Sequence, residues 1–192
     1  MYWCCQQFLH RFLLFENMNR VTIISGTNRP GNNSQHISRF CLEYLKSEGV
    51  EVNIFSLEDL PEDFAFNEQY GRRSEKFDKV IKTFIEPVDK FVFVVPEYNG
   101  GFPGVLKTFI DCVPPPNWQN KMAALIGLSS GHAGNSRGLD HLTGVLHYLK
   151  MEVMALKPKL SNIESLLDEN KNLIDERGQK SVKEQMEKLM LF

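Results

Sequence analysis

The segment GTNRPGNNS at 26–34 combines hydroxyl, amide and glycine residues with a single arginine. It leads into the start of an expected helix, where free backbone N–H groups and the positive end of the helix dipole attract anions. The residues expected to bind a phosphate here are Thr27, Arg29, Asn32, Asn33 and Ser34. A polar turn with a helix-capping residue would contain the same residue types, so both interpretations remain open.

The residues around the two glycines exclude two common nucleotide-binding motifs. Gly26 and Gly31 have the spacing of a Walker loop, but Asn32 and Asn33 stand where that loop needs a lysine and a serine or threonine. The segment also lacks the G-x-G-x-x-G turn of dinucleotide-binding folds. The expected phosphate site is therefore of another kind.

A second unusual segment, PEYNGGFPG at 96–104, follows the most hydrophobic run of the chain. Its paired glycines let the backbone approach a flat ligand, its tyrosine offers an apolar face with a polar tip, and its asparagine offers donors and acceptors. If the glycines only turned the chain toward the following proline, the adjacent glutamate, tyrosine and asparagine would be unexplained. The residues expected to contact a planar heteroaromatic ring are Pro96, Glu97, Tyr98, Asn99 and Gly100.

The third segment, SSGHAGNSRG at 129–138, again joins small residues to one arginine. It either forms the far wall of the same ring site or caps the helix that follows, and we favour the wall. The residues expected to contribute are Ser130, Gly131 and Arg137. His132 is assigned no catalytic role, because a lone loop histidine is usually a surface residue.

Short apolar runs predict the strands that position these segments. The run at 21–24 is β-branched and the run at 91–95 reads FVFVV, as expected for strands buried on both faces of a parallel sheet. The five expected strands are 21–24, 50–55, 91–95, 122–128 and 153–156.

Apolar residues at helical spacing predict helices between and after the strands. The first stripe, at 37–45, is expected to be capped by Asn33 or Ser34 and closed by Gly49. The other stripes lie at 77–84, 106–113, 139–149 and 182–190.

Local signals refine these boundaries. Pro103 is expected in the first turn of its helix, and Ser181 with Glu184 has the spacing of a capping box. The segment 57–71, which contains Pro61 and scattered acids, is expected to be irregular.

Alternating strands and helices require right-handed crossovers and a parallel sheet with helices on both faces. The pattern predicts an α/β protein with a flavodoxin-like, doubly wound, five-stranded sheet of order 2-1-3-4-5. Ligands of such sheets bind beyond the carboxyl ends of the strands, where the strand order reverses. The segments 26–34, 96–104 and 129–138 follow the first, third and fourth strands, so all three are expected at that edge.

Composition excludes several classes of protein. The chain has 192 residues, which indicates one domain. Its formal net charge of −2 gives no sign of the clustered basic residues that bind nucleic acid. No run reaches the roughly 18 to 20 apolar residues of a membrane span, and polar residues interrupt the N-terminus too often for a secretion signal. We therefore expect a cytoplasmic protein with neither a nucleic-acid nor a membrane partner.

Residues 1–17 are surplus to the predicted domain, which can be built from 18–192. We expect them to be either an upstream start that native translation does not use, which we favour, or a segment that packs on a neighbouring subunit. The four cysteines lack the spacing of metal sites and disulfide frameworks, so structural or incidental roles and no metal site are expected. They are Cys4, Cys5, Cys41 and Cys112.

The three segments together resemble the NADPH-dependent FMN reductase family, which includes quinone, azo-dye and chromate reductases. The resemblance extends from about Asn19 to the C-terminal helix. Its most specific part is PEYN at 96–99 followed by PG at 103–104, LK at 106–107 and ID at 110–111.

This resemblance implies non-covalent FMN, with its phosphate on the first segment and its isoalloxazine ring against PEYN. Thr27 and Arg29 match the family's G-S-x-R start, whereas Asn32 replaces the next serine and keeps a hydrogen-bond donor there. It further implies that NADPH or NADH reduces FMN and leaves, after which the flavin reduces a small-molecule electron acceptor such as a quinone, an azo compound or free flavin. No catalytic side chain is assigned, because the flavin carries the chemistry.

The resemblance also implies a homodimer or homotetramer with the flavin near the subunit interface. Two other functions remain open. One is a flavodoxin-like electron carrier, which the near-neutral charge mildly disfavours because such carriers tend to be strongly acidic. The other is a non-catalytic flavin-binding protein.

Overall fold

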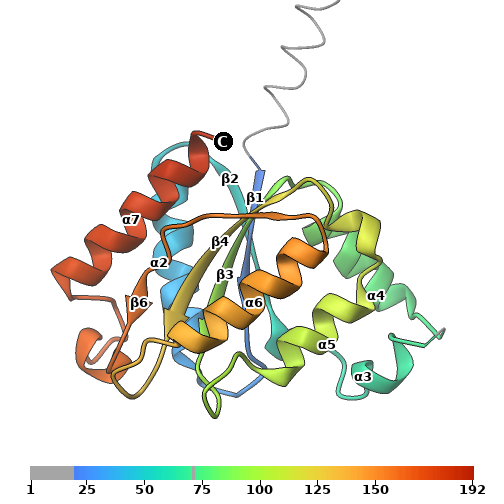
Figure 1. Ribbon diagram of the computed structural model, residues 1–192, viewed down its shortest axis with the longest axis horizontal. Coiled ribbons are helices and arrows are strands. Elements are labelled where there is room, and N and C mark those ends of the chain that lie inside the picture. The colour runs from blue at the N-terminus through green and yellow to red at the C-terminus, as the bar shows by residue number, and fades with distance from the viewer. Residues whose placement is uncertain (1–19, 71) are drawn as a thin grey trace, which may run out of the picture.

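The computed structural model describes residues 20–70 and 72–192, which form a parallel sheet between two layers of helices (Figure 1). The strand order β2-β1-β3-β4-β5 confirms the predicted doubly wound arrangement. The strands are β1 (Arg20–Ser25), β2 (Glu51–Ser56), β3 (Lys90–Pro96), β4 (Met122–Leu128) and β5 (Glu152–Val153). The predicted extension at 1–17 lies outside the described residues.

The fifth position of the sheet differs from the prediction of one strand at 153–156. Two short strands, β5 and β6 (Lys159–Leu160), pair with opposite ends of β4. Pro158 precedes β6 and has no N–H for a ladder, although its carbonyl accepts from the Gly127 N–H at 2.9 Å. The Gln185 side chain donates to the carbonyls of Leu125 and Leu156 in the gap, so a side chain replaces the missing ladder bonds.

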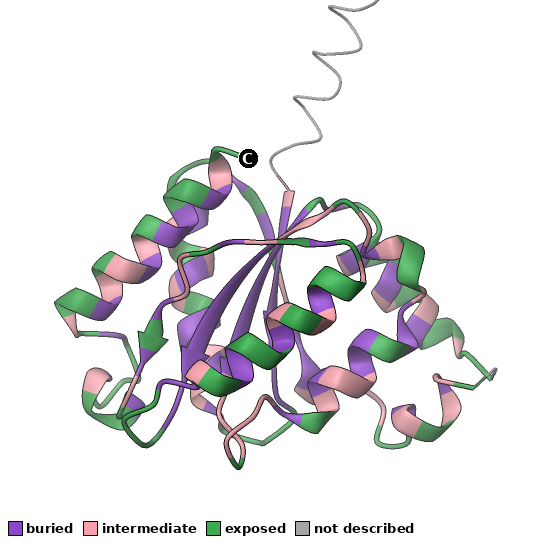
Figure 2. Ribbon diagram, in the orientation of Figure 1, coloured by how far each residue is buried: buried purple, intermediate pink, exposed green. Residues whose placement is uncertain are grey.

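Helices cover both faces of the sheet, as predicted, because alternate strand residues point in opposite directions. Phe91 and Phe93 of β3 pack into one apolar cluster, whereas Val92 and Val94 pack into the other, and all four are fully buried. Figure 2 shows that the central strands of the sheet are largely buried between the two helix layers. On one side lie α2 (Asn33–Ser47) and α7 (Glu176–Met190); on the other lie α3 (Phe64–Asn67), α4 (Glu75–Val80), α5 (Gly104–Cys112) and α6 (Ser136–Tyr148).

Three helix starts differ from the sequence-based expectations. The cap of α2 is Asn32 and not Asn33 or Ser34, because the Asn32 side chain accepts from the Gln35 N–H. Helix α7 begins before the expected capping box, since Asp175 accepts from the Gly178 N–H at 2.7 Å. Pro103 is the N-cap of α5 and precedes its first turn.

The segment expected to be irregular, 57–71, contains regular turns. A 3-10 turn spans Leu57–Asp59, and α3 follows because Phe64 is buried in the core. Other short elements are a π-helical turn at Ile81–Ile85 and 3-10 turns at Pro115–Asn117 and Ile163–Leu166. Within the described ranges, no helix is both long enough and apolar enough to cross a membrane.

Two of the four cysteines lie in the described part of the chain, and both are buried. Burial raises the pKa of the Cys41 thiol to about 12 and that of Cys112 to about 11, so both stay protonated and unreactive near neutral pH. These features fit the predicted structural role.

We expect a thiol-alkylating reagent at pH 8 to leave Cys41 and Cys112 unmodified in the native protein and to label both after unfolding. The thiolate is the nucleophile, and neither residue offers an exposed one. Peptide mapping by mass spectrometry separates these sites from Cys4 and Cys5. Rapid labelling of Cys41 in the folded protein would contradict the prediction.

Candidate functional site

The three predicted segments meet at the carboxyl edge of the sheet, at the lower edge in Figure 1. They surround a pocket with a volume of about 350 Å³. Its lining is largely polar and comes from four parts of the chain: Arg29, Pro30, Gly31, Asn32, Asn33 and Ser34; Pro96, Glu97 and Tyr98; Leu128, Ser129 and Ser130; and Ile163, Glu164 and Lys171.

Asn32 shapes the first segment. Its amide nitrogen donates to the Arg29 carbonyl at 2.8 Å and to Glu58 at 3.0 Å, while its oxygen accepts from the Gln35 N–H at 3.0 Å. Both amide hydrogens are therefore engaged within the protein. The expected spare donor at Asn32 is not available in this arrangement, because the side chain serves as the helix cap.

Other groups at the start of α2 can hold an anion. The first-turn N–H groups of Asn33 and Ser34 have no acceptor within the helix. The Ser34 hydroxyl is fully buried at the pocket and, among the described residues, has no hydrogen-bond partner. An unpaired buried hydroxyl costs free energy, so this group fits a bound oxygen. Arg29 is exposed at the rim and supplies positive charge.

A hydroxyl pair joins the first segment to the second. The Thr27 hydroxyl is buried, lies 2.6 Å from the Tyr98 hydroxyl and accepts from the Arg29 N–H at 3.3 Å. Thr27 therefore supports the pocket through Tyr98 and does not itself line it. The contact links the Tyr98 side chain to the first segment.

The tip of the second segment is a tight turn. Tyr98 and Gly101 exchange two backbone hydrogen bonds of 2.9 and 3.1 Å, and the left-handed Asn99 (φ 52°) and Gly100 (φ 79°) form the tip. Pro96, Glu97 and Tyr98 line the pocket, whereas Asn99 and Gly100 lie beyond its lining.

The third segment serves both as a wall of the site and as the start of α6. Asn135, the N-cap of α6, is fully buried and donates to the carbonyls of Val95 and Pro96 at 3.0 Å each. Its N–H donates to the Glu97 carboxylate at 3.1 Å. These bonds tie α6 to the end of β3.

The predicted residues of the third segment have different positions. Ser130 lines the pocket, whereas Gly131 and Arg137 do not. Arg137 instead lies against the turn at 98–101, because a Cβ added to Gly100 would stand 2.9 Å from its Nη1.

Sequence reasoning missed a fourth wall, which begins after the last strand. The N–H groups of Asn162 and Ile163 donate to Gly131 and Ser129 at 2.8 and 3.0 Å and hold the 3-10 turn against the third segment. Glu164 and Lys171 thereby reach the pocket. No motif marks this segment, and only its long-range backbone bonds bring it to the site.

The electrostatics of the pocket are mixed. Arg29 and Lys171 are cationic, whereas Glu97 and Glu164 are anionic. Burial lowers the pKa of His36, and the charges of Arg39 and Lys171 lower it further. His36 therefore adds little positive charge near neutral pH.

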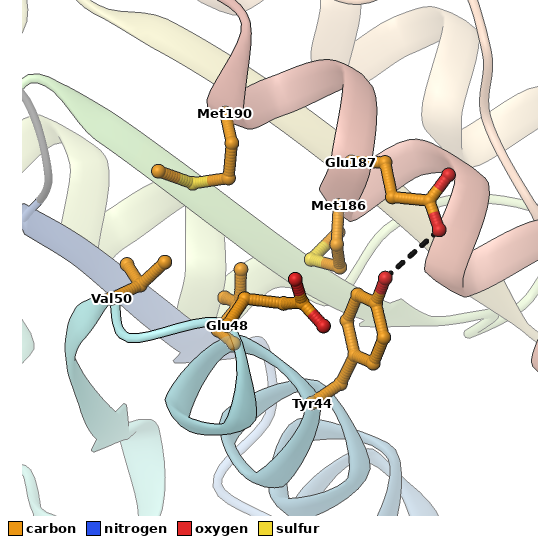
Figure 3. A pocket seen from close by; sticks show the side chains of 7 residues that line it. Tyr44, Glu48, Val50, Met186, Glu187 and Met190 are labelled. Carbon is orange, nitrogen blue, oxygen red and sulfur yellow. Dashed lines mark hydrogen bonds between the residues drawn. The ribbon is translucent and has the colours of Figure 1, made fainter.

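A second hollow lies between α2 and α7 (Figure 3). Tyr44 donates to Glu187 at 2.9 Å across it, and Met186 and Met190 form an apolar wall. Burial, with Glu187 adding to the effect, raises the pKa of Tyr44 to about 12. None of the residues predicted for the site lines this hollow, which is therefore separate from it.

The doubly wound sheet and the polar pocket at its carboxyl edge define a flavodoxin-like protein. Residues 19–162 match the model of the NADPH-dependent FMN reductase family, and the chain belongs to this family. This confirms the resemblance carried by the three segments, and with it FMN and NAD(P)H as the family's cofactors.

Relatives cover nearly the whole chain. The chain is 31% identical over 175 residues to a 2-hydroxy-1,4-benzoquinone reductase from a Burkholderia species. The alignment covers 88% of this chain and 93% of the relative. It is 27% identical to an NAD(P)H-dependent FMN reductase from Pseudomonas aeruginosa, over 90% of this chain and 94% of that one.

Solved structures agree with the fold. A flavoenzyme NAD(P)H:(acceptor) oxidoreductase from Paracoccus denitrificans superposes with a TM-score of 0.73 at 20% identity and covers 90% of this chain and 96% of that one. At this identity the likeness concerns the fold alone.

Proposed function

We propose that this protein is an FMN-dependent NAD(P)H oxidoreductase that passes electrons to a small planar acceptor of the quinone class. The observation that carries the proposal is that the start of α2, with its free N–H groups, lines the same pocket as Pro96, Glu97 and Tyr98 of the PEYN segment. The pocket lies at the carboxyl edge of the sheet, where doubly wound folds bind ligands.

The residues at the pocket fit FMN. The Asn33 and Ser34 N–H groups, the Ser34 hydroxyl and Arg29 would hold the phosphate. Among the described residues the Ser34 hydroxyl has no other partner. The segment that begins at Pro96 and the third segment, which contributes Ser130, would orient the ring. When bound, FMN supplies the hydride chemistry, and the protein side chains bind and orient it without acting as an acid or base.

The acceptor class is inferred from relatives. The Burkholderia relative is named for a benzoquinone, which is planar and small enough to stack on a flavin. A Staphylococcus saprophyticus relative is named an FMN-dependent NADPH-azoreductase, so an azo compound is the second acceptor to test.

Anaerobic NADPH titration of the FMN-loaded protein tests the proposal. The flavin absorbance should bleach and return when a quinone is added, and NADPH oxidation should exceed the free-flavin background. Bleaching by dithionite but not by NADPH or NADH would instead favour an electron carrier. If the protein did not bind FMN at all, both the oxidoreductase and the electron-carrier functions would be contradicted.

Arg29→Ala should raise the Kd for FMN about 3- to 30-fold and change that for riboflavin less than about twofold, because only FMN has a phosphate to pair with the guanidinium. Quenching of flavin fluorescence measures both constants. Arg39→Ala is the matched control, since Arg39 is an exposed arginine of α2 outside the pocket lining. Equal losses for the two flavins would remove Arg29 from the phosphate site.

A homodimer or homotetramer and a cytoplasmic location stay predictions. Large exposed aromatic side chains, Phe66, Tyr70 and Tyr148, offer surface for self-association. Sedimentation velocity across a range of protein concentrations measures the assembly, and a monomer at all concentrations would contradict it.

A further inference from the structure

We propose that Lys171 and Glu164 act as opposing charges that set how strongly flavin affinity depends on the phosphate. Lys171 would be a second cationic contact for the phosphate, beside Arg29, and Glu164 would weaken binding of the dianion. The inference rests on the proposed function, because it assigns further residues to the same site. Both residues lie beyond the 19–162 match to the family model.

The backbone holds Lys171 in one place. It occupies the left-handed region (φ 63°) in a turn closed by its N–H to the Asp168 carbonyl at 2.9 Å. Asp168 also accepts from the Asn172 backbone and side chain at 2.7 and 3.0 Å. A bridge between Leu167 and Leu173 closes the base of the turn. The Lys171 side chain is thus presented to the pocket from a fixed position.

The surroundings of Lys171 place its charge beside the start of α2. The same pocket is lined by Gly31, Asn33 and Ser34 of the first segment. Its charge also acts on His36, in the second turn of α2. A phosphate at the free N–H groups of this helix start would therefore lie in a pocket lined by both Arg29 and Lys171.

Glu164 competes with a phosphate for the same donors. One of its carboxylate oxygens accepts from the Ser130 hydroxyl at 3.0 Å and from the Asn33 amide at 3.5 Å. It thereby links the first and third segments across the pocket. A phosphate carrying about −1.5 to −2 charge near pH 7 is repelled by this carboxylate, whereas uncharged riboflavin is not.

Lys171→Gln should raise the Kd for FMN about 3- to 10-fold, and Glu164→Gln should lower it by a similar factor. These effects are modest because both side chains are exposed and their charges are partly screened by solvent and salt. Riboflavin should change less than about twofold in both variants. Glutamine keeps the acceptor that Ser130 and Asn33 use, so Glu164→Gln removes the charge and leaves the link in place.

The experiment is a fluorescence-quenching titration of wild type and variants with FMN and riboflavin at about 20 and 200 mM salt, where screening differs strongly. Lys150→Gln is the matched control, since Lys150 is an exposed lysine in the same backbone region (φ 60°) that does not line the pocket. The variant effects on FMN should shrink at high salt. Thermal melting checks that each variant is folded.

The outcomes separate the hypotheses. Equal effects of Lys171→Gln on both flavins, or no difference from Lys150→Gln, would overturn the cationic role. Weaker binding of both flavins in Glu164→Gln would show that Glu164 supports the wall and would overturn its opposing role. If the wild type bound neither flavin, the proposed function itself would be wrong. That result would not depend on Lys171 or Glu164, because it comes from the unmodified protein.

Discussion

Replacing Gly138 with alanine is expected to lower the free energy of unfolding by about 1–3 kcal/mol, the usual cost of overpacking, and to weaken FMN binding at least about tenfold. An alanine Cβ would lie 2.0 Å from Asn135 Oδ1 and 2.7 Å from both the Gly101 carbonyl carbon and the Phe102 nitrogen. Because two of these contacts are with backbone, α6 and the turn at 98–101 must separate. That movement displaces two walls of the proposed flavin site.

Gly144→Ala is the control for this substitution. Gly144 belongs to the same helix and is exposed, and no atom of the described residues lies within 4 Å of an added Cβ, so alanine should stabilise the protein by up to about 1 kcal/mol. Urea unfolding and flavin titration measure both effects. If the two variants had the same stability and affinity, the close packing of α6 against the turn would not matter for the site.

Asn135→Asp should destabilise the protein by about 3–5 kcal/mol, the range for an uncompensated buried charge. The side chain is fully buried and its amide donates to the carbonyls of Val95 and Pro96. An aspartate would instead turn a carboxylate toward these two oxygens, close to Glu97. The two side-chain hydrogen bonds that connect the start of α6 to the end of β3 would then be lost.

Asn162→Asp provides the comparison. Like Asn135, Asn162 is a left-handed N-cap (φ 49°) for which the described residues show no side-chain capping bond, but Asn162 is exposed. We expect its effect on the free energy of unfolding to stay within about 0.5 kcal/mol, as for most surface substitutions. Asn135→Asp within about 1 kcal/mol of this control would mean that the buried amide does not hold the two segments together.

The strand order could be predicted from the sequence because apolar runs and helical stripes alternate without a break. In β3, the run FVFVV is apolar at every position, and the structure buries alternate side chains in two different clusters. A strand buried on both faces needs this pattern, which therefore indicates a central parallel strand. The fifth strand was harder to predict from the sequence. Pro158 lies between its two short pieces, and the Gln185 side chain from α7 supplies hydrogen bonds between them.

Details of the predicted site were harder to foresee. Asn32 was expected to offer a donor to the phosphate, but its amide is used by Arg29 and Glu58. Residue type shows what an amide can donate, whereas its partners depend on neighbours from other parts of the chain. Glu58, for example, follows β2 and reaches Asn32 only after β1 and β2 pair.

The sequence by itself determined the fold class, the edge of the sheet that carries the site and the protein family, because each depends on local periodicity or on contiguous residues such as PEYN. Only the tertiary structure decided which side chains face the pocket. In that structure the Ser34 hydroxyl has no partner among the described residues, Arg137 lies against the turn at 98–101, and Glu164 and Lys171 line the pocket. These placements depend on hydrogen bonds and packing between segments far apart in the chain, and no local pattern records them.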